Sequence, residues 1–188
     1  MIWRWILIPS TTTMRELHGV LQLAMGWDGI HLFQFDIRAV QYGSFELLAE
    51  NPNILLSKFD FRMGDRFSYV YDMGDHWEHE ISVKEFDHAQ PKKTYPLCTG
   101  GFGACPPEDC GGPHAYLERK DEANGYDAWM DMDVMSGFAK ELVKTHNAGK
   151  LVSDFQTEDV IESSFSRRTV NRGFREGRHL QLMHQQIM

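Results

Sequence analysis

The sequence predicts a single α+β domain in which a mixed or antiparallel sheet packs with helices. Three observations lead to this fold class. Apolar residues recur at helical spacing behind residue 13, they alternate in two segments on either side of residue 74, and strands and helices intermix without a regular βαβ rhythm. The centre of the predicted sheet is a hairpin over residues 66–83.

The chain begins with a strand, a helix and a second strand. Residues 2–8 are rich in Ile and Trp and predict a strand. Thr13 and Glu16 have the spacing of a capping box, and the apolar stripe behind them predicts a helix over 14–25 with one buried face. Residues 31–38 then alternate between apolar and polar side chains, which predicts a strand with one buried face.

The predicted hairpin consists of two alternating segments, 67–72 and 77–83, joined by a turn around Gly74. The alternation in the second segment places Trp77 and Ile81 on the inner face. We therefore expect an antiparallel pair at the centre of the sheet.

The remaining segments are less regular. Residues 39–63 show no clear pattern, and residues 91–113 are rich in Gly and Pro, which predicts a loop. Helical spacing predicts helices near 114–122, 136–146 and 157–175.

Length and charge indicate one domain with a basic end. The chain has 188 residues and a net charge of −8. Residues 163–188 contain one acidic residue and five arginines, so they carry +4, and residues 1–162 carry −12. We predict a domain over 1–162 and a basic tail over 163–188 that docks on, or lies loosely against, the acidic body. The five arginines are Arg167, Arg168, Arg172, Arg175 and Arg178.

Composition excludes several classes of protein. A hydrophobic content of 42% is sufficient for a packed core and argues against a disordered chain. No apolar run has the length of a membrane span, and Pro9 interrupts the N-terminal apolar run too early for a signal peptide. The odd number of cysteines, 3, argues against a disulfide framework. We expect a soluble cytoplasmic protein.

All three cysteines lie in the Gly/Pro-rich loop, which indicates either a metal site or a packed loop. Three thiolates and one imidazole form a tetrahedral ligand set for zinc. The alternative is that the thiols are small buried side chains with no ligand. The candidate ligands are Cys98, Cys105, Cys110, His79 and His114, with His76 as an alternative to His79.

The hairpin turn gathers polar residues that indicate an acid–base site or a structural role. Asp72, Asp75, His76 and His79 are the catalytic candidates, because paired carboxylates and imidazoles can exchange protons with a substrate. The structural alternative is that the two aspartates accept hydrogen bonds from turn amides and that His79 is a buried imidazole held by hydrogen bonds.

Two further histidines, His18 and His31, accompany the predicted helix and the strand that follows it. They indicate either polar groups within the fold or a second set of metal ligands.

Four blocks of the sequence occur in one order along the chain. They are Ile2-Trp-Arg4 with Ile8-Pro9; Thr13–His18 through Ala24–Trp27 and His31–Phe35; Gly64–Phe67 with Tyr71–Glu80; and Cys98 with Ala104–Gly112. Together these blocks resemble the plasmid pRiA4b ORF-3-like domain family. Relative to the family pattern, the chain begins almost on the Trp-Arg segment, so a preceding edge strand is either absent or removed by truncation.

The resemblance implies an α+β domain and a link to mobile elements, because members of the family occur as passenger proteins of insertion elements. It implies no reaction. We therefore expect an interaction or accessory domain with an unknown protein partner and a structural metal at the cysteine loop.

Two other functions remain open. One is a metal- or acid/base-dependent hydrolase that uses the Asp/His hairpin. The other is nucleic-acid binding through the arginine-rich tail, which the acidic charge of the whole chain disfavours.

Overall fold

The structure is a computed structural model that describes residues 1–120 and 165–183. The chain divides into two compact units, Met1–Gly112 with Ser164–Met188, and Pro113–Ser163. The first unit mixes helices with antiparallel sheets, which confirms the predicted α+β class. The predicted domain boundary at residues 162 and 163 lies outside the described residues and stays a prediction.

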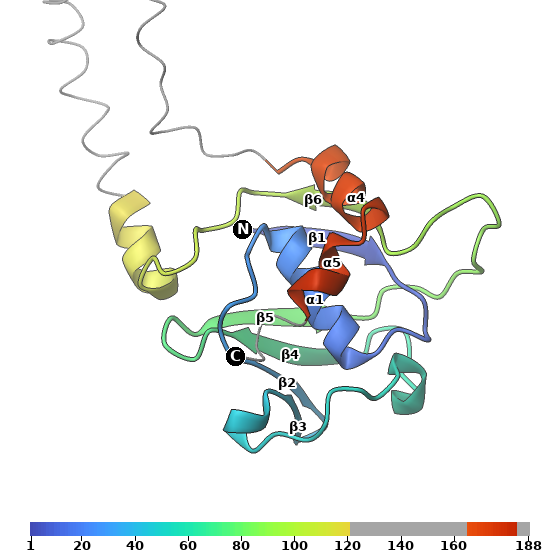
Figure 1. The fold of residues 1–188 in the computed structure, drawn as a ribbon, viewed down its shortest axis with the longest axis horizontal. Coiled ribbons are helices and arrows are strands. Elements are labelled where there is room, and N and C mark those ends of the chain that lie inside the picture. The colour runs from blue at the N-terminus through green and yellow to red at the C-terminus, as the bar shows by residue number, and fades with distance from the viewer. Residues whose placement is uncertain (121–164, 184–188) are drawn as a thin grey trace, which may run out of the picture. The chain divides into compact units, whose positions relative to one another are not determined.

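A four-stranded antiparallel sheet forms the centre of the first unit (Figure 1). Its strand order is β3-β2-β4-β5, so the β4–β5 hairpin lies beside β2. Large aromatic side chains of β2 and β4 fill its inner face, because alternate residues of a strand point to the same side. The strands are β2 (Phe33–Ile37), β3 (Val40–Gly43), β4 (Arg66–Tyr71) and β5 (Trp77–Ser82).

The antiparallel hairpin around Gly74 is confirmed. Tyr71 pairs with Trp77 and Tyr69 pairs with His79 across the two strands. Trp77 is buried, as predicted, whereas Ile81 is half-buried near the outer end of the edge strand β5.

Helix α1 (Met14–Met25) has the predicted bounds and the predicted cap. Thr13 Oγ1 accepts from the Glu16 amide at 3.1 Å, and the Glu16 carboxylate accepts from the Thr13 amide at 2.7 Å. Gly26 ends the helix with a φ of 82°, a conformation that glycine adopts without strain. Two short 3-10 helices, η1 (Phe45–Leu47) and η2 (Leu56–Phe59), lie in the segment whose sequence shows no pattern.

Strand β6 (Leu97–Phe102) corrects the prediction of a loop over residues 91–113. It pairs antiparallel with β1 (Trp3–Leu7) in a second, two-stranded sheet. The glycines in this strand concealed it in the sequence. Packing explains one of them, because a Cβ on Gly101 would lie 2.5 Å from the Phe165 ring.

The C-terminal segment folds into two helices, α4 (Arg167–Arg175) and α5 (Arg178–Leu182). Both contact α1, which lies between them and the four-stranded sheet (Figure 1). Val170 and Phe174 are buried in one apolar cluster with residues of α1 and with Cys98. The segment therefore docks as predicted, and the apolar face of α4 is buried in the contact.

Residues 112–120 are helical, in agreement with the helix predicted near 114–122. The helix predicted at 136–146 and the first part of the one predicted at 157–175 lie outside the described residues. Within the described ranges, no helix has the length and apolar character needed to cross a bilayer.

Candidate functional site

The two most distinctive segments of the sequence lie against each other. One is the turn between β4 and β5, residues 72–76, and the other is the cysteine-bearing loop, residues 103–112, which we call the cysteine loop. A third segment, residues 27–31 between α1 and β2, completes the contact. Residues far apart in the sequence are thus brought to one place.

Three hydrogen bonds fix the cysteine loop on the rest of the unit. The indole of Trp27 donates to the Pro106 carbonyl at 2.8 Å. The Glu108 carboxylate accepts from the Asp28 amide at 2.6 Å and from the Tyr71 hydroxyl. Because both carboxylate oxygens of Glu108 are engaged, the loop has a defined position beside the sheet.

The end of the cysteine loop approaches the hairpin turn closely. Gly111 donates its amide to Asp75 Oδ2 at 3.0 Å. Gly112 has a φ of 80°, and a Cβ at this position would collide with the Asp75 carbonyl oxygen. Only glycine fits at position 112, so this contact explains the second glycine of the Cys-Gly-Gly sequence.

The hairpin turn is organised by Asp72. Its Oδ1 accepts from the amides of Gly74 and Asp75 at 2.9 and 3.2 Å, and its own φ is 56°. Asp and Asn tolerate this left-handed conformation better than most residues. The predicted structural role of Asp72 in the turn is confirmed, and its second oxygen, Oδ2, is directed elsewhere.

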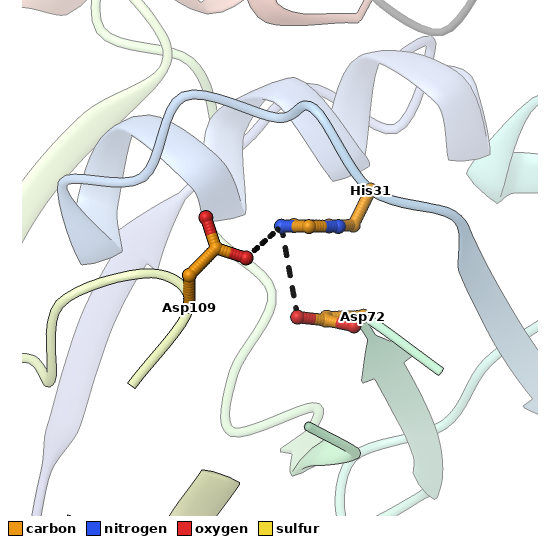
Figure 2. A group of neighbouring side chains, drawn as sticks. All are labelled: His31, Asp72 and Asp109. Atoms are coloured by element: carbon orange, nitrogen blue, oxygen red, sulfur yellow. Dashed lines mark ion pairs between the residues drawn. The ribbon is translucent and has the colours of Figure 1, made fainter. Parts of the chain in front are cut away.

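His31, Asp72 and Asp109 converge at the junction of the three segments (Figure 2). His31 Nε2 lies 3.0 Å from Asp109 Oδ1 and 3.6 Å from Asp72 Oδ2. The three ligating atoms lie within 4.8 Å of one another. The Asp72 side chain is 11% exposed and that of Asp109 is 66% exposed, so the cluster has a buried side and a solvent side.

This arrangement has two chemical uses. One imidazole nitrogen and two carboxylate oxygens form a ligand set for a divalent transition metal, and three protein ligands leave further positions open. Alternatively, a protonated His31 pairs with the two carboxylates and holds the cysteine loop against the turn.

The three predicted thiol ligands lie in different surroundings. Cys98 is buried in β6, and its Sγ donates to the Gly100 carbonyl at 3.4 Å. The Cys105 thiol lies 2.9 Å from an Arg4 nitrogen and 3.4 Å from the Met25 sulfur, while Cys110 is buried near the end of the loop.

The surroundings of Cys98 and Cys105 disfavour the thiolate form of both side chains. Burial raises the pKa of both, and the nearby Arg4 guanidinium partly opposes the shift. Among the described residues, the only group of three or more His, Cys, Asp or Glu with converging ligand atoms is His31, Asp72 and Asp109. The zinc site predicted on the thiols stays a prediction.

The other predicted histidine ligands make contacts with residues other than the cysteines. His79 Nδ1 is hydrogen bonded to the Trp77 carbonyl at 3.0 Å, and its ring contacts Trp27 and Tyr69. Burial lowers the pKa of His79, and the carbonyls around it oppose that shift. His114 belongs to the second unit, where it is exposed and lies 3.3 Å from Glu118.

Of the four catalytic candidates, only Asp72 belongs to the convergent cluster. The Asp75 carboxylate is engaged by the Gly111 amide, and His76 is exposed on the turn with a φ of 53°. His31 was predicted as one of a second pair of candidate ligands. Asp109 was not predicted, and the one signal for it was its place in the Pro-Pro-Glu-Asp-Cys sequence.

His18 has a structural environment. It is fully buried, its Nδ1 lies 2.7 Å from the Tyr69 hydroxyl, and its ring stacks on Phe33 at 3.9 Å. The same hydroxyl accepts from Gln22 Nε2 at 2.8 Å. Burial lowers the pKa of His18 to about 3, so the imidazole is neutral in the folded protein.

The comparisons with known proteins place the chain in one family. The model of the plasmid pRiA4b ORF-3-like protein family matches residues 1–139. Uncharacterized protein y4hQ of Sinorhizobium fredii (strain NBRC 101917 / NGR234) is 37% identical over 123 residues, which cover 62% of this chain and 63% of that protein. The chain thus matches less than two thirds of the length of this relative.

A solved structure shares the fold. The crystal structure of MM3350 from Methanosarcina mazei Go1, a protein of unknown function, has a TM-score of 0.59 and 28% sequence identity, and the match covers 64% of this chain and 71% of that chain. The matched region of the family model includes the hairpin, the cysteine loop and all three residues of the cluster. The chain belongs to the plasmid pRiA4b ORF-3-like protein family.

Proposed function

We propose that this chain is an interaction domain that carries one divalent metal ion on His31, Asp72 and Asp109. The observation that carries the proposal is the convergence of their three ligand atoms within 4.8 Å from three separate segments. A metal at this point links the 27–31 segment, the hairpin turn and the cysteine loop, so its role is to fix a surface for a partner.

The surroundings of the cluster support a metal ion. Asp72 is held by the turn amides through Oδ1, which leaves Oδ2 directed at His31. Two carboxylates that approach one point repel each other, and a divalent cation bound between them would offset this repulsion. One nitrogen and two oxygen ligands suit Zn²⁺ or Mn²⁺ better than Ca²⁺, which prefers oxygen ligands alone.

A surface feature of the same unit supports the interaction role. Trp3, Trp5 and Phe102 are 40%, 58% and 63% exposed, and Trp3 pairs with Phe102 across the β1–β6 ladder. Exposed aromatic side chains are the type that protein interfaces use. The partner that we propose is accordingly a protein.

Metal binding by chelator-treated protein tests the proposal. Isothermal titration with Zn²⁺ and Mn²⁺ should show one site per chain, and Asp109→Asn or His31→Gln should abolish it. The matched control is Asp87→Asn, which removes an exposed carboxylate outside the cluster and should leave binding unchanged. No heat of binding in the parent, or equal binding by the Asp109→Asn variant, would contradict the proposal.

The exposure of Asp109 favours a hydrolase as the second candidate. With three protein ligands, a metal ion here has open positions on its solvent side, where it can hold a water molecule and a substrate oxygen. The neighbouring His76 on the turn is a candidate proton carrier. Metal-dependent hydrolysis of phosphodiester or carboxylic ester substrates, lost in Asp72→Asn, would favour this candidate over the interaction role.

Two further aspects of function are proposals that rest on the family and the sequence. The family's name refers to a plasmid, which supports a link to mobile elements. The thiols of Cys98 and Cys105, which form no disulfide, support a reducing compartment such as the cytoplasm.

A further inference from the structure

A groove lies between strand β6 and helix α4, away from the metal cluster's residues. Its volume is about 620 Å³, and one wall is formed by residues 97–99 of β6 with Lys93 before them. The other wall consists of residues of α4. The side chains on that wall are Arg167, Arg168, Thr169, Asn171, Arg172 and Arg175.

The two walls are fixed relative to each other by hydrogen bonds across the floor of the groove. Asn171 accepts from the Cys98 amide at 2.8 Å and donates to the Cys98 carbonyl at 2.9 Å, as a neighbouring strand would. Arg167 donates to the Thr99 carbonyl at 3.1 Å. With Val170 and Phe174 buried behind it, α4 presents its arginines from a rigid support.

The groove is strongly basic in an acidic protein. Five cationic side chains line it, and the described lining residues include no carboxylate. Within residues 1–120 and 165–183, none of these five cations forms an ion pair. All four arginines are exposed. Because such a concentration of unpaired charge opposes folding through self-repulsion, it indicates a site for an anionic ligand.

We propose that this groove binds single-stranded nucleic acid through its phosphate backbone, without sequence preference. Arginines from 167 to 175 extend over about 12 Å of helix, so they can contact more than one phosphate of the same strand. Guanidinium groups bind phosphate oxygens in a bidentate manner.

The shape and the lining of the groove favour one strand over a duplex and the backbone over the bases. The groove has a volume of about 620 Å³ and walls on two sides, and we therefore propose one strand and not a duplex as its ligand. No aromatic side chain is among the described lining residues, so there is no platform on which bases would stack. Recognition therefore rests on charge.

Fluorescence anisotropy with a labelled oligo-dT of about 15 nucleotides tests the proposal. Binding should weaken steeply with salt, by roughly a hundredfold between about 50 and 200 mM if all five cations contact phosphates. The Arg172→Gln/Arg175→Gln variant should bind at least about tenfold more weakly. The slope of log K against log salt concentration should be less steep by about 1.4 in this variant.

Two other double variants complete the design. Lys93→Gln/Arg168→Gln removes one charge from each wall and should have a similar effect. Arg38→Gln/Arg178→Gln removes two exposed charges outside the groove and should bind like the parent. Urea unfolding of each variant confirms that it is folded.

Several results would overturn the proposal. These are no binding at the lowest salt, equal losses in the groove and control variants, tighter binding of duplex than of single strands, or equal competition by poly-glutamate. The last result would indicate an acidic protein segment as the ligand. The proposal is independent of the metal site, so chelator-treated protein and the His31→Gln variant should bind the oligonucleotide like the parent.

Discussion

The Tyr71 hydroxyl donates a hydrogen bond to the Glu108 carboxylate and thereby joins the end of β4 to the cysteine loop. The other oxygen of that carboxylate accepts from the Asp28 amide. One acidic side chain thus connects the three segments that supply His31, Asp72 and Asp109. The position of Asp109 in the cluster depends on this connection.

Replacement of Tyr71 by Phe should loosen the cysteine loop. Burial raises the pKa of Tyr71, so the hydroxyl is protonated and its loss removes a hydrogen bond to a carboxylate. We expect a decrease in unfolding free energy of roughly 1–3 kcal/mol. Amide hydrogen exchange over residues 104–112 should become faster, whereas in the control Tyr42→Phe it should stay at the parent rate. Unchanged exchange in Tyr71→Phe would show that other contacts hold the loop.

Replacement of Asp72 by Ala should destabilise the hairpin more than replacement by Asn. Alanine loses both hydrogen bonds to the turn amides and is strained at a φ of 56°, while asparagine retains an acceptor and tolerates that conformation. We expect Asp72→Ala to lower the unfolding free energy by roughly 1–3 kcal/mol in urea denaturation. Equal stability of the two variants would exclude this role of the side chain.

Acid should destabilise the protein through His18. The folded protein keeps His18 neutral down to about pH 3, whereas the unfolded chain takes up a proton near its ordinary pKa of 6.5. The stabilisation is therefore complete above pH 6.5 and is lost as the pH falls from 6.5 toward 3, by about 1.4 kcal/mol per pH unit. Urea unfolding at a series of pH values should show a shallower slope for His18→Gln than for the parent. Identical slopes would contradict burial of a neutral imidazole.

Replacement of His79 by Ala should affect stability and leave metal binding intact. The imidazole packs against Trp27 and Tyr69 and is hydrogen bonded to the Trp77 carbonyl. We expect a loss of about 1–3 kcal/mol from the cavity and the unpaired carbonyl. Thermal unfolding and zinc titration check both parts, and a variant that melts like the parent but loses metal would assign His79 to a metal site.

Local sequence signals were sufficient for α1 and for the β4–β5 hairpin. The Thr13–Glu16 capping box, Gly26 at the helix end and the alternation around Gly74 each encode an element within a few residues. Strand β6 could not be predicted in this way. Its Gly101 is explained by Phe165, which packs against it from the C-terminal part of the chain.

The candidate site was predictable only in part for the same reason. The polar turn and the Gly/Pro-rich loop were recognised separately, but their contact depends on Glu108, Asp75 and Gly112, whose partners are distant in sequence. The arginines of α4 were recognised as a basic segment. The groove includes Arg167 because β6 supplies the opposite wall.

An anomalous difference map from crystals grown with Mn²⁺ tests the central claim, that His31, Asp72 and Asp109 form a metal site. We predict one peak about 2.0–2.3 Å from His31 Nε2 and from one oxygen of each aspartate. The same map from crystals grown with Zn²⁺ at the zinc edge should show its peak at this position and not beside the thiols. A peak among Cys98, Cys105 and Cys110, or no peak at the three residues with either metal, would contradict the account.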